Sequence, residues 1–253
     1  MKLATFDAGD GPRAGEVRGE EVVEFTSGTV LDRLASGDRT PADGAAHRLA
    51  DVTLLAPIPR PPAIFCIGRN YAAHIAELGS EKPEKPLVFL KLPLSSAPPG
   101  GPVRIPAASS ALDYEVELVL VMGPDNQIAG YAVANDVSAR DLQRTEAQWS
   151  RAKAFDSSCP WGPWITTDAD PSDLRLTTHV NGEQRQDGRT KDLIFKPREL
   201  VDFIAQACTL EPGALILTGT PSGVGEASGT YLQPGDVVRC EVEGLGAIEH
   251  PIA

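Results

Sequence analysis

Short apolar runs separated by turn residues dominate the chain after residue 62. Runs rich in Val, Ile, Thr and aromatic side chains, bounded by Gly, Pro, Asn or Asp, predict strands. Asn181-Gly182 follows one run directly and is a typical hairpin turn. The pattern predicts a mostly antiparallel, rolled or barrel-like sheet rather than a doubly wound parallel one. The predicted strands are Ala63–Ile67, Leu87–Lys91, Tyr114–Met122, Ile128–Asn135, Trp164–Thr166, Leu176–Val180, Leu215–Thr218 and Val237–Val242.

Helical periodicity is confined to a few segments of the same region. We expect a short helix over Tyr71–Leu78, a longer one over Ala139–Ser150 and an amphipathic one over Pro197–Ala207. In the last of these, apolar residues recur at spacings of three and four. The fold class is therefore mainly β with few helices (α+β).

The first 56 residues differ from the rest in pattern. They contain short alternating segments and one apparent helix, Val30–Leu34, and they end at Pro57–Pro62, which reads as a stiff linker. We therefore expect a small N-terminal domain over residues 1–56 and a larger domain over residues 63–253.

The composition limits the classes of partner. The chain has 253 residues, with 23 basic against 35 acidic residues and a net charge of -12. This charge argues against nucleic acid and anionic membranes, which need a basic surface, and favours a small-molecule partner. The first ten residues hold no sustained apolar run, and no stretch approaches the roughly 18 apolar residues of a membrane span. We expect a cytoplasmic location.

The four cysteines form no C-x-x-C pair, so neither a zinc site nor a redox pair is encoded locally. We expect all of them to be small core residues. They are Cys66, Cys159, Cys208 and Cys240.

Two glutamates interrupt the apolar strand predicted around residues 114–122. Glu115 and Glu117 are two apart, so their side chains point to the same face. Like charges held close together are relieved by a shared proton or a hard divalent cation. The pair indicates either a metal site or a solvated strand face.

Other residues allow a chemical and a structural interpretation side by side. His74 and Glu77 are three residues apart on a predicted helix, so their side chains lie on one face. The pair is either a general base oriented by a carboxylate or an ordinary surface pair. Asp136, where a strand gives way to a helix, is either a third carboxylate ligand or a helix cap. Lys153 is either a pocket ammonium that binds a carboxylate or a surface lysine.

A Gly-rich loop follows the strand Leu215–Thr218. It lacks the Gly-Lys-Ser/Thr of a phosphate-binding loop, so nucleotide binding is not expected. Its backbone N–H groups and the Thr220 hydroxyl are suited to hold a carboxylate oxygen.

Taken together, five blocks resemble the fumarylacetoacetate hydrolase (FAH) family, in order and with typical spacing. The resemblance covers nearly all of residues 63–250. The blocks are Gly68-Arg69-Asn70-Tyr71 with His74 and Glu77, Asp113–Leu118, Asn135–Gln143, Lys153–Asp156 and Gly219–Gly225.

The resemblance implies a mixed β-sandwich roll behind a small N-terminal domain, and a homodimer. It implies a metal site for Mg²⁺, with Mn²⁺ as the alternative, and a substrate that is a 2-oxo acid. The implied metal ligands are Glu115, Glu117 and Asp136, the catalytic residues His74, Glu77 and Lys153, and the substrate contacts Arg69, Tyr71, Gln143, Lys153 and Thr220.

The activity implied first is hydrolysis of a C–C bond in a 2,4-dioxo acid of the acylpyruvate or fumarylpyruvate type, through a metal-bound enolate. The same enolate serves an oxaloacetate-type decarboxylase, or an isomerase or tautomerase of an unsaturated 2-oxo diacid in aromatic catabolism. A keto-acid binding protein without turnover is the non-enzymatic alternative.

Overall fold

The computed structural model describes residues 1–253. Strands hold 38% of the residues and helices 19%, which confirms the mainly β class. One sheet has twelve strands, with the order β4-β3-β2-β1-β13-β11-β10-β16-β6-β7, while β5 pairs with β1 and β8 with β13. Its strands are β1 (Lys2–Asp7), β2 (Pro12–Arg18), β3 (Glu21–Glu24), β4 (Ala46–Arg48), β5 (Thr53–Leu55), β6 (Ile64–Gly68), β7 (Leu87–Lys91), β8 (Ser96–Ala97), β10 (Val116–Met122), β11 (Ile128–Asn135), β13 (Cys159–Thr166) and β16 (Leu215–Leu217).

The remaining strands form two smaller sheets, and six helices and four 3₁₀ turns complete the fold. A four-stranded antiparallel sheet has the order β15-β14-β17-β18, and a two-stranded one pairs β12 with β9. Their bounds are β9 (Leu112–Asp113), β12 (Ser138–Ala139), β14 (Arg175–Val180), β15 (Glu183–Arg189), β17 (Val237–Val242) and β18 (Gly246–Pro251). The helices are α1 (Val30–Ser36), α2 (Ala72–Glu77), α3 (Arg140–Thr145), α4 (Ser150–Lys153), α5 (Pro197–Ala205) and α6 (Gly225–Ser228), with 3₁₀ turns η1 (Leu49–Asp51), η2 (Pro93–Ser95), η3 (Pro124–Asn126) and η4 (Thr190–Asp192).

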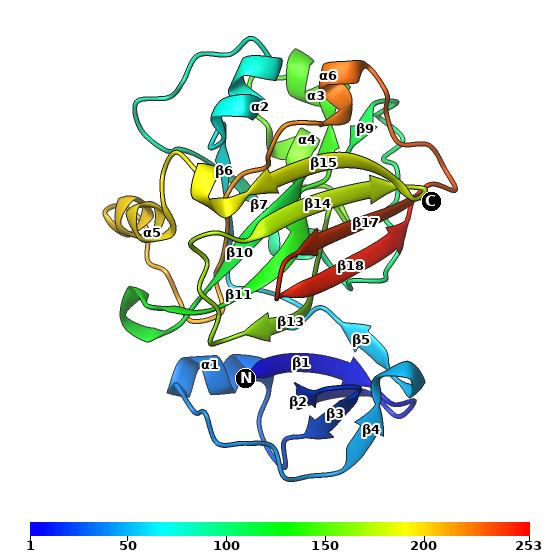
Figure 1. Ribbon diagram of the computed structural model, residues 1–253, viewed down its shortest axis with the longest axis vertical. Helices are drawn as coiled ribbons and strands as arrows, with labels where there is room; N and C mark the ends of the chain where they lie inside the picture. The colour runs from blue at the N-terminus through cyan, green and yellow to red at the C-terminus, as the bar shows by residue number, and fades with distance from the viewer.

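The central strand β10 is buried along its whole length. Leu118 and Leu120 belong to the core shared with the four-stranded sheet, while Val119 and Val121 point into a second core on the other face. Successive strand residues alternate faces, so a strand buried on both sides must be apolar throughout. Figure 1 shows the four-stranded sheet lying across β10 and β11.

The N-terminal strands continue the large sheet, because β1 pairs with β13 through Lys2 with Thr166 and Leu3 with Ile165. Figure 1 shows β1 to β5 at one end of the molecule and α2, α3, α4 and α6 gathered at the opposite end. The division into domains at residues 56 and 63 stays a prediction.

Two sequence expectations were wrong. The helix predicted over Ala139–Ser150 is broken, since Glu146 is extended between α3 and α4. The break lets Trp149 pack edge-on against Phe89 at 5.3 Å between ring centroids. Cys208 is exposed just beyond α5, whereas the other three cysteines are buried as expected.

None of the helices has both the length and the apolar character needed to cross a membrane.

Candidate active site

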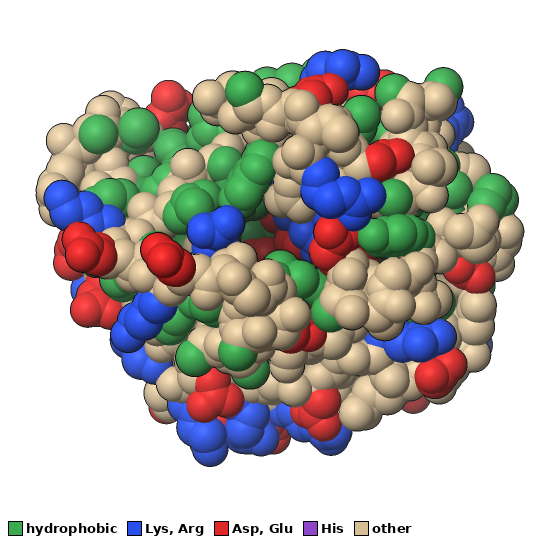
Figure 2. Space-filling view, turned by 90° about the horizontal axis from the view of Figure 1, so that it is seen from above, with side chains coloured by type: hydrophobic (Ala, Val, Ile, Leu, Met, Phe, Trp, Pro, Cys, Tyr) green, Lys and Arg blue, Asp and Glu red, His purple; other side chains and the backbone are tan.

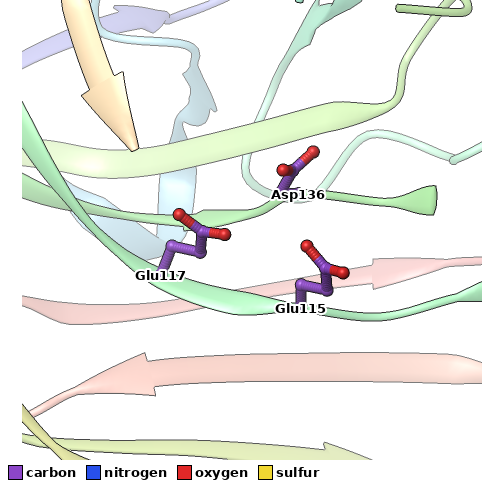
Figure 3. Close-up of side chains that lie close together, drawn as sticks. All are labelled: Glu115, Glu117 and Asp136. Carbon is purple, nitrogen blue, oxygen red and sulfur yellow. The ribbon is translucent and has the colours of Figure 1, made fainter. Parts of the chain in front are cut away.

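Three carboxylates meet at the end of the β10–β11 pair. Glu115 directly precedes β10, Glu117 lies on β10, and Asp136 directly follows β11. The antiparallel register sets Val116 opposite Asn135, so Asp136 reaches the glutamates. One oxygen from each residue lies within 4.8 Å of the others, and the residues are at most 5% exposed. Figure 3 shows the three carboxylates gathered around one space. Burial rules out a solvated strand face.

Three buried cations surround these carboxylates. Lys153 Nζ donates to Glu115 Oε2 at 2.6 Å and to Asp136 Oδ2 at 2.9 Å. Lys91 Nζ donates to Asp136 Oδ1 at 2.7 Å. The Arg140 guanidinium bridges Glu115 at 2.6 Å and the buried Asp113 at 2.7 Å. Lys153 is therefore no surface lysine, and its ammonium is paired with the proposed metal ligands.

The charges of this cluster do not cancel. Four buried carboxylates, Asp113 included, face three cations, so one negative charge is in excess when all four carboxylates are ionised. Burial, together with the nearby Asp136 and Glu115 carboxylates, raises the pKa of Glu117 well above its ordinary value. Burial also opposes ionisation of Glu115, but Lys153 and Arg140 outweigh it and lower the pKa of Glu115 to about 2. An excess negative charge on hard oxygen donors fits a divalent cation.

The imidazole of His74 is held by Glu77 within α2. His74 Nδ1 and Glu77 Oε1 lie 2.7 Å apart, and the second Glu77 oxygen accepts from Gly223 N at 2.9 Å. His74 is buried, which excludes an ordinary surface pair. With Nδ1 facing the carboxylate, Nε2 is the nitrogen available for proton transfer.

The Gly-rich loop binds carboxylates of the protein itself. Gly219 N donates to Glu117 at 2.5 Å, Gly223 N to Glu77, and Gly225 N to Asp113 at 2.7 Å. Gly219 has φ +102°, and a Cβ there would lie 2.8 Å from Asn70 Cβ. These three N–H groups are already used, which differs from the expectation that they hold a ligand.

A cavity of about 320 Å³ connects these groups to solvent. Figure 2, seen from the end that carries α2 and α3, shows a hollow with acidic atoms deep inside and basic side chains near its rim. Of the predicted site residues, Arg69, His74, Glu115, Glu117, Gln143, Lys153 and Thr220 line the cavity.

The other predicted site residues lie outside the cavity wall. Asp136 is buried behind it and Glu77 behind His74. Tyr71 is buried, does not line the cavity, and its hydroxyl has no hydrogen-bond partner.

Gln143, which lines the cavity, accepts a hydrogen bond from Arg140 at 2.8 Å.

Comparison with known proteins identifies the family. Residues 63–253 match the model described as fumarylacetoacetate (FAA) hydrolase, C-terminal. The protein belongs to this family. Residues 1–57 match a second model, described as Rv2993c-like, N-terminal.

Family relatives carry the names of different reactions. Oxaloacetate tautomerase fahd2, mitochondrial, from Xenopus laevis is 40% identical over 229 residues, covering 83% of this chain and 72% of that protein. The structure of 5-carboxymethyl-2-hydroxymuconate delta-isomerase from Mycobacterium smegmatis has a TM-score of 0.87 and 38% identity, covering 100% of this chain and 99% of the other. The fumarylacetoacetate hydrolase from Exiguobacterium antarcticum has a TM-score of 0.89 and 36% identity, with the same coverage.

Proposed function

We propose that this protein is a divalent-metal-dependent tautomerase or isomerase of a 2-oxo diacid, moving a proton at the carbon beside the keto group. The observation that carries this proposal is the imidazole of His74, held by Glu77, in one cavity with the buried carboxylates. Relatives named as an oxaloacetate tautomerase and a muconate-type isomerase support it.

Glu115, Glu117 and Asp136 would hold the cation, Mg²⁺ or alternatively Mn²⁺, whose oxygen preferences are similar. Bound there, a divalent cation supplies positive charge that favours the oxygens of a 2-oxo acid as they gain negative charge. Lys153, Lys91 and Arg140 hold Glu115 and Asp136 in place through ion pairs.

We assign proton transfer to the His74–Glu77 pair. His74 Nε2 takes the proton from the carbon beside the keto group, and Glu77 orients the ring through its contact with Nδ1. The same imidazole returns the proton to the oxygen or to another carbon, which interconverts the keto and enol forms or shifts a double bond.

The cavity wall favours a substrate with two carboxylates. Only four of its sixteen residues are hydrophobic. Arg69 lines it without an ion-pair partner, whereas Arg144 is paired with Glu226 at 2.7 Å. We propose that Arg69 binds the distal carboxylate, while Thr220, Gln143 and Lys153 contact the 2-oxo acid end. Tyr71 is proposed to support these contacts from behind the wall.

Hydrolysis of an acylpyruvate or fumarylpyruvate is the second candidate. The His74–Glu77 pair is also suited to activate a water molecule. In addition, a structural relative is named a hydrolase. Decarboxylation of an oxaloacetate-like acid needs the same charge stabilisation and is a third outcome of the same site. A protein that binds keto acids without turnover would lack all three activities.

A substrate screen separates these reactions. Oxaloacetate, acetylpyruvate, fumarylpyruvate and an unsaturated 2-oxo diacid are each incubated with and without Mg²⁺, and enol absorbance, carbon dioxide and released acid are followed. We expect Mg²⁺-dependent interconversion of the diacids without carbon loss. Cleavage of the acylpyruvates with no effect on the diacids would instead establish a hydrolase.

We also propose that the protein is a cytoplasmic homodimer. The edge strand β7 and the residues after it carry a strip of apolar residues, each of which is 36 to 54% exposed. An exposed apolar strip can pack against its own copy across a two-fold axis, which buries the strip of each copy. The strip consists of Val88, Leu90, Leu92 and Leu94.

Leu90→Asp is expected to convert the dimer to a monomer, because it buries a charge at the centre of the strip. Light scattering after size-exclusion chromatography measures the mass. Val237→Asp is the matched control, since Val237 is 40% exposed on β17 and away from β7. A wild-type monomer, or a Leu90→Asp variant that stays dimeric, would contradict the proposed interface.

A further inference from the structure

Gln186, on β15, is fully buried and uses its whole hydrogen-bonding capacity. Its Oε1 accepts from Val116 N at 3.0 Å and from Thr178 Oγ1 at 2.7 Å. Its Nε2 donates to Thr220 Oγ1 at 2.8 Å and to the carbonyl of Pro221 at 2.9 Å. The amide therefore joins Val116, which lies between the two glutamates, to the Gly-rich loop.

The orientation of this amide follows from its partners. A backbone N–H can only donate, so the amide oxygen must face Val116. A backbone carbonyl can only accept, so the amide nitrogen must face Pro221. Both ends require the same orientation.

This orientation fixes the polarity of the Thr220 hydroxyl. Because Nε2 of Gln186 donates to it, Thr220 Oγ1 is an acceptor in that bond, and its own proton is left for another partner. No protein atom accepts that proton, and Thr220 lines the cavity. The hydroxyl is thus set to donate into the cavity.

The donor lies beside the metal-ligand cluster. Thr220 follows Gly219, whose N–H is bonded to Glu117, and Val116 lies between the two glutamates. A ligand group that binds to Thr220 therefore also lies next to the carboxylate cluster.

We propose that Gln186 is a positioning residue that makes Thr220 an obligatory hydrogen-bond donor to the carboxylate next to the keto group of the substrate. This inference rests on the proposed function for the identity of the ligand. It predicts that the group bound at Thr220 is an acceptor, such as a carboxylate oxygen, and that a donor group is rejected.

The test uses oxalate, which resembles the 2-oxo acid end, titrated calorimetrically into the Mg²⁺-loaded protein and its variants. Thr220→Val removes the donor and Thr220→Ser keeps it. Gln186→Glu keeps the acceptor for Val116 and Thr178 but presents a second oxygen to Thr220, which then donates away from the cavity. Gln184→Glu, on the same strand and exposed, is the matched control.

We expect oxalate to bind about tenfold more weakly to Thr220→Val and to Gln186→Glu, the effect of losing one hydrogen bond to a charged group. Thr220→Ser and Gln184→Glu should bind like wild type. The double variant with Gln186→Glu and Thr220→Val should bind no more weakly than Thr220→Val alone, because Gln186 acts through Thr220. Additive losses, or wild-type affinity in a folded Gln186→Glu variant, would overturn the proposal.

A measurement on wild type covers the case in which Gln186→Glu does not fold. The two side-chain N–H protons of Gln186 should exchange slowly with solvent in NMR spectra, with and without oxalate, because both are bonded and buried. Exchange at the rate of an exposed amide would overturn the proposal. If oxalate behaves as expected but no 2-oxo diacid is turned over, the proposed function fails and the role of Gln186 stands.

Discussion

Glu117→Gln is expected to abolish divalent-cation binding and to lower turnover of the 2-oxo diacid about a thousandfold, corresponding to roughly 4 kcal/mol of lost charge stabilisation. The other two carboxylates of the cluster have both oxygens paired with lysine or arginine. Glu117 has one oxygen bonded to Gly219 N and a second with no protein donor. That second oxygen is the one readiest to bind a cation.

Calorimetric titration with Mg²⁺ and with Mn²⁺ measures the binding, and the screen described above measures turnover. Asp136→Ala should have the same effect on both. Glu241→Gln, an exposed charge-neutralising substitution on β17, is the control and should leave both unchanged. Dialysis of wild type against a chelator should stop turnover, and added Mg²⁺ should restore it. Full activity in metal-free Glu117→Gln would remove the metal assignment.

His74→Asn is expected to lower turnover by about 10² to 10⁴, the usual contribution of a positioned general base, while Mg²⁺ still binds. The imidazole makes no hydrogen bond to the three carboxylates of the cluster, so its loss leaves the cation ligands in place. The separation of the two effects distinguishes the base from the metal site.

His179→Asn is the matched control, because His179 lies on β14 in the four-stranded sheet and does not line the cavity. Thermal unfolding of both variants checks that the buried His74 position tolerates the change. Turnover retained in a folded His74→Asn variant would mean that another residue moves the proton.

The grouping of the three carboxylates has a local cause in the sequence. Glu115 and Glu117 share a face by strand periodicity, and a short connection between two strands brings Asp136 beside them. The His74–Glu77 contact was predictable for the same reason, since it spans less than one helical turn.

Among the groups that neutralise and orient the site, Lys153 and Glu77 were predicted, whereas Lys91 and Gln186 were not. Lys91 ends an apolar strand and reaches Asp136 across 45 positions of the sequence, and Gln186 reaches Val116 across 70. Such contacts depend on how distant strands are brought together, which local periodicity does not encode. Arg140 lay within a recognised block but carried no local sign of its contact with Glu115. The break at Glu146 was missed because the helical pattern continues across it.

The Gly-rich loop couples parts of the site that would otherwise order separately. Three of its amides hold carboxylates from β10, from α2 and from the segment at β9. Opening the loop would release all three together, so the site should open as one cooperative unit. Hydrogen exchange at Gly219, Gly223 and Gly225 should then report a single opening free energy, and a bound divalent cation should slow all three amides by the same factor.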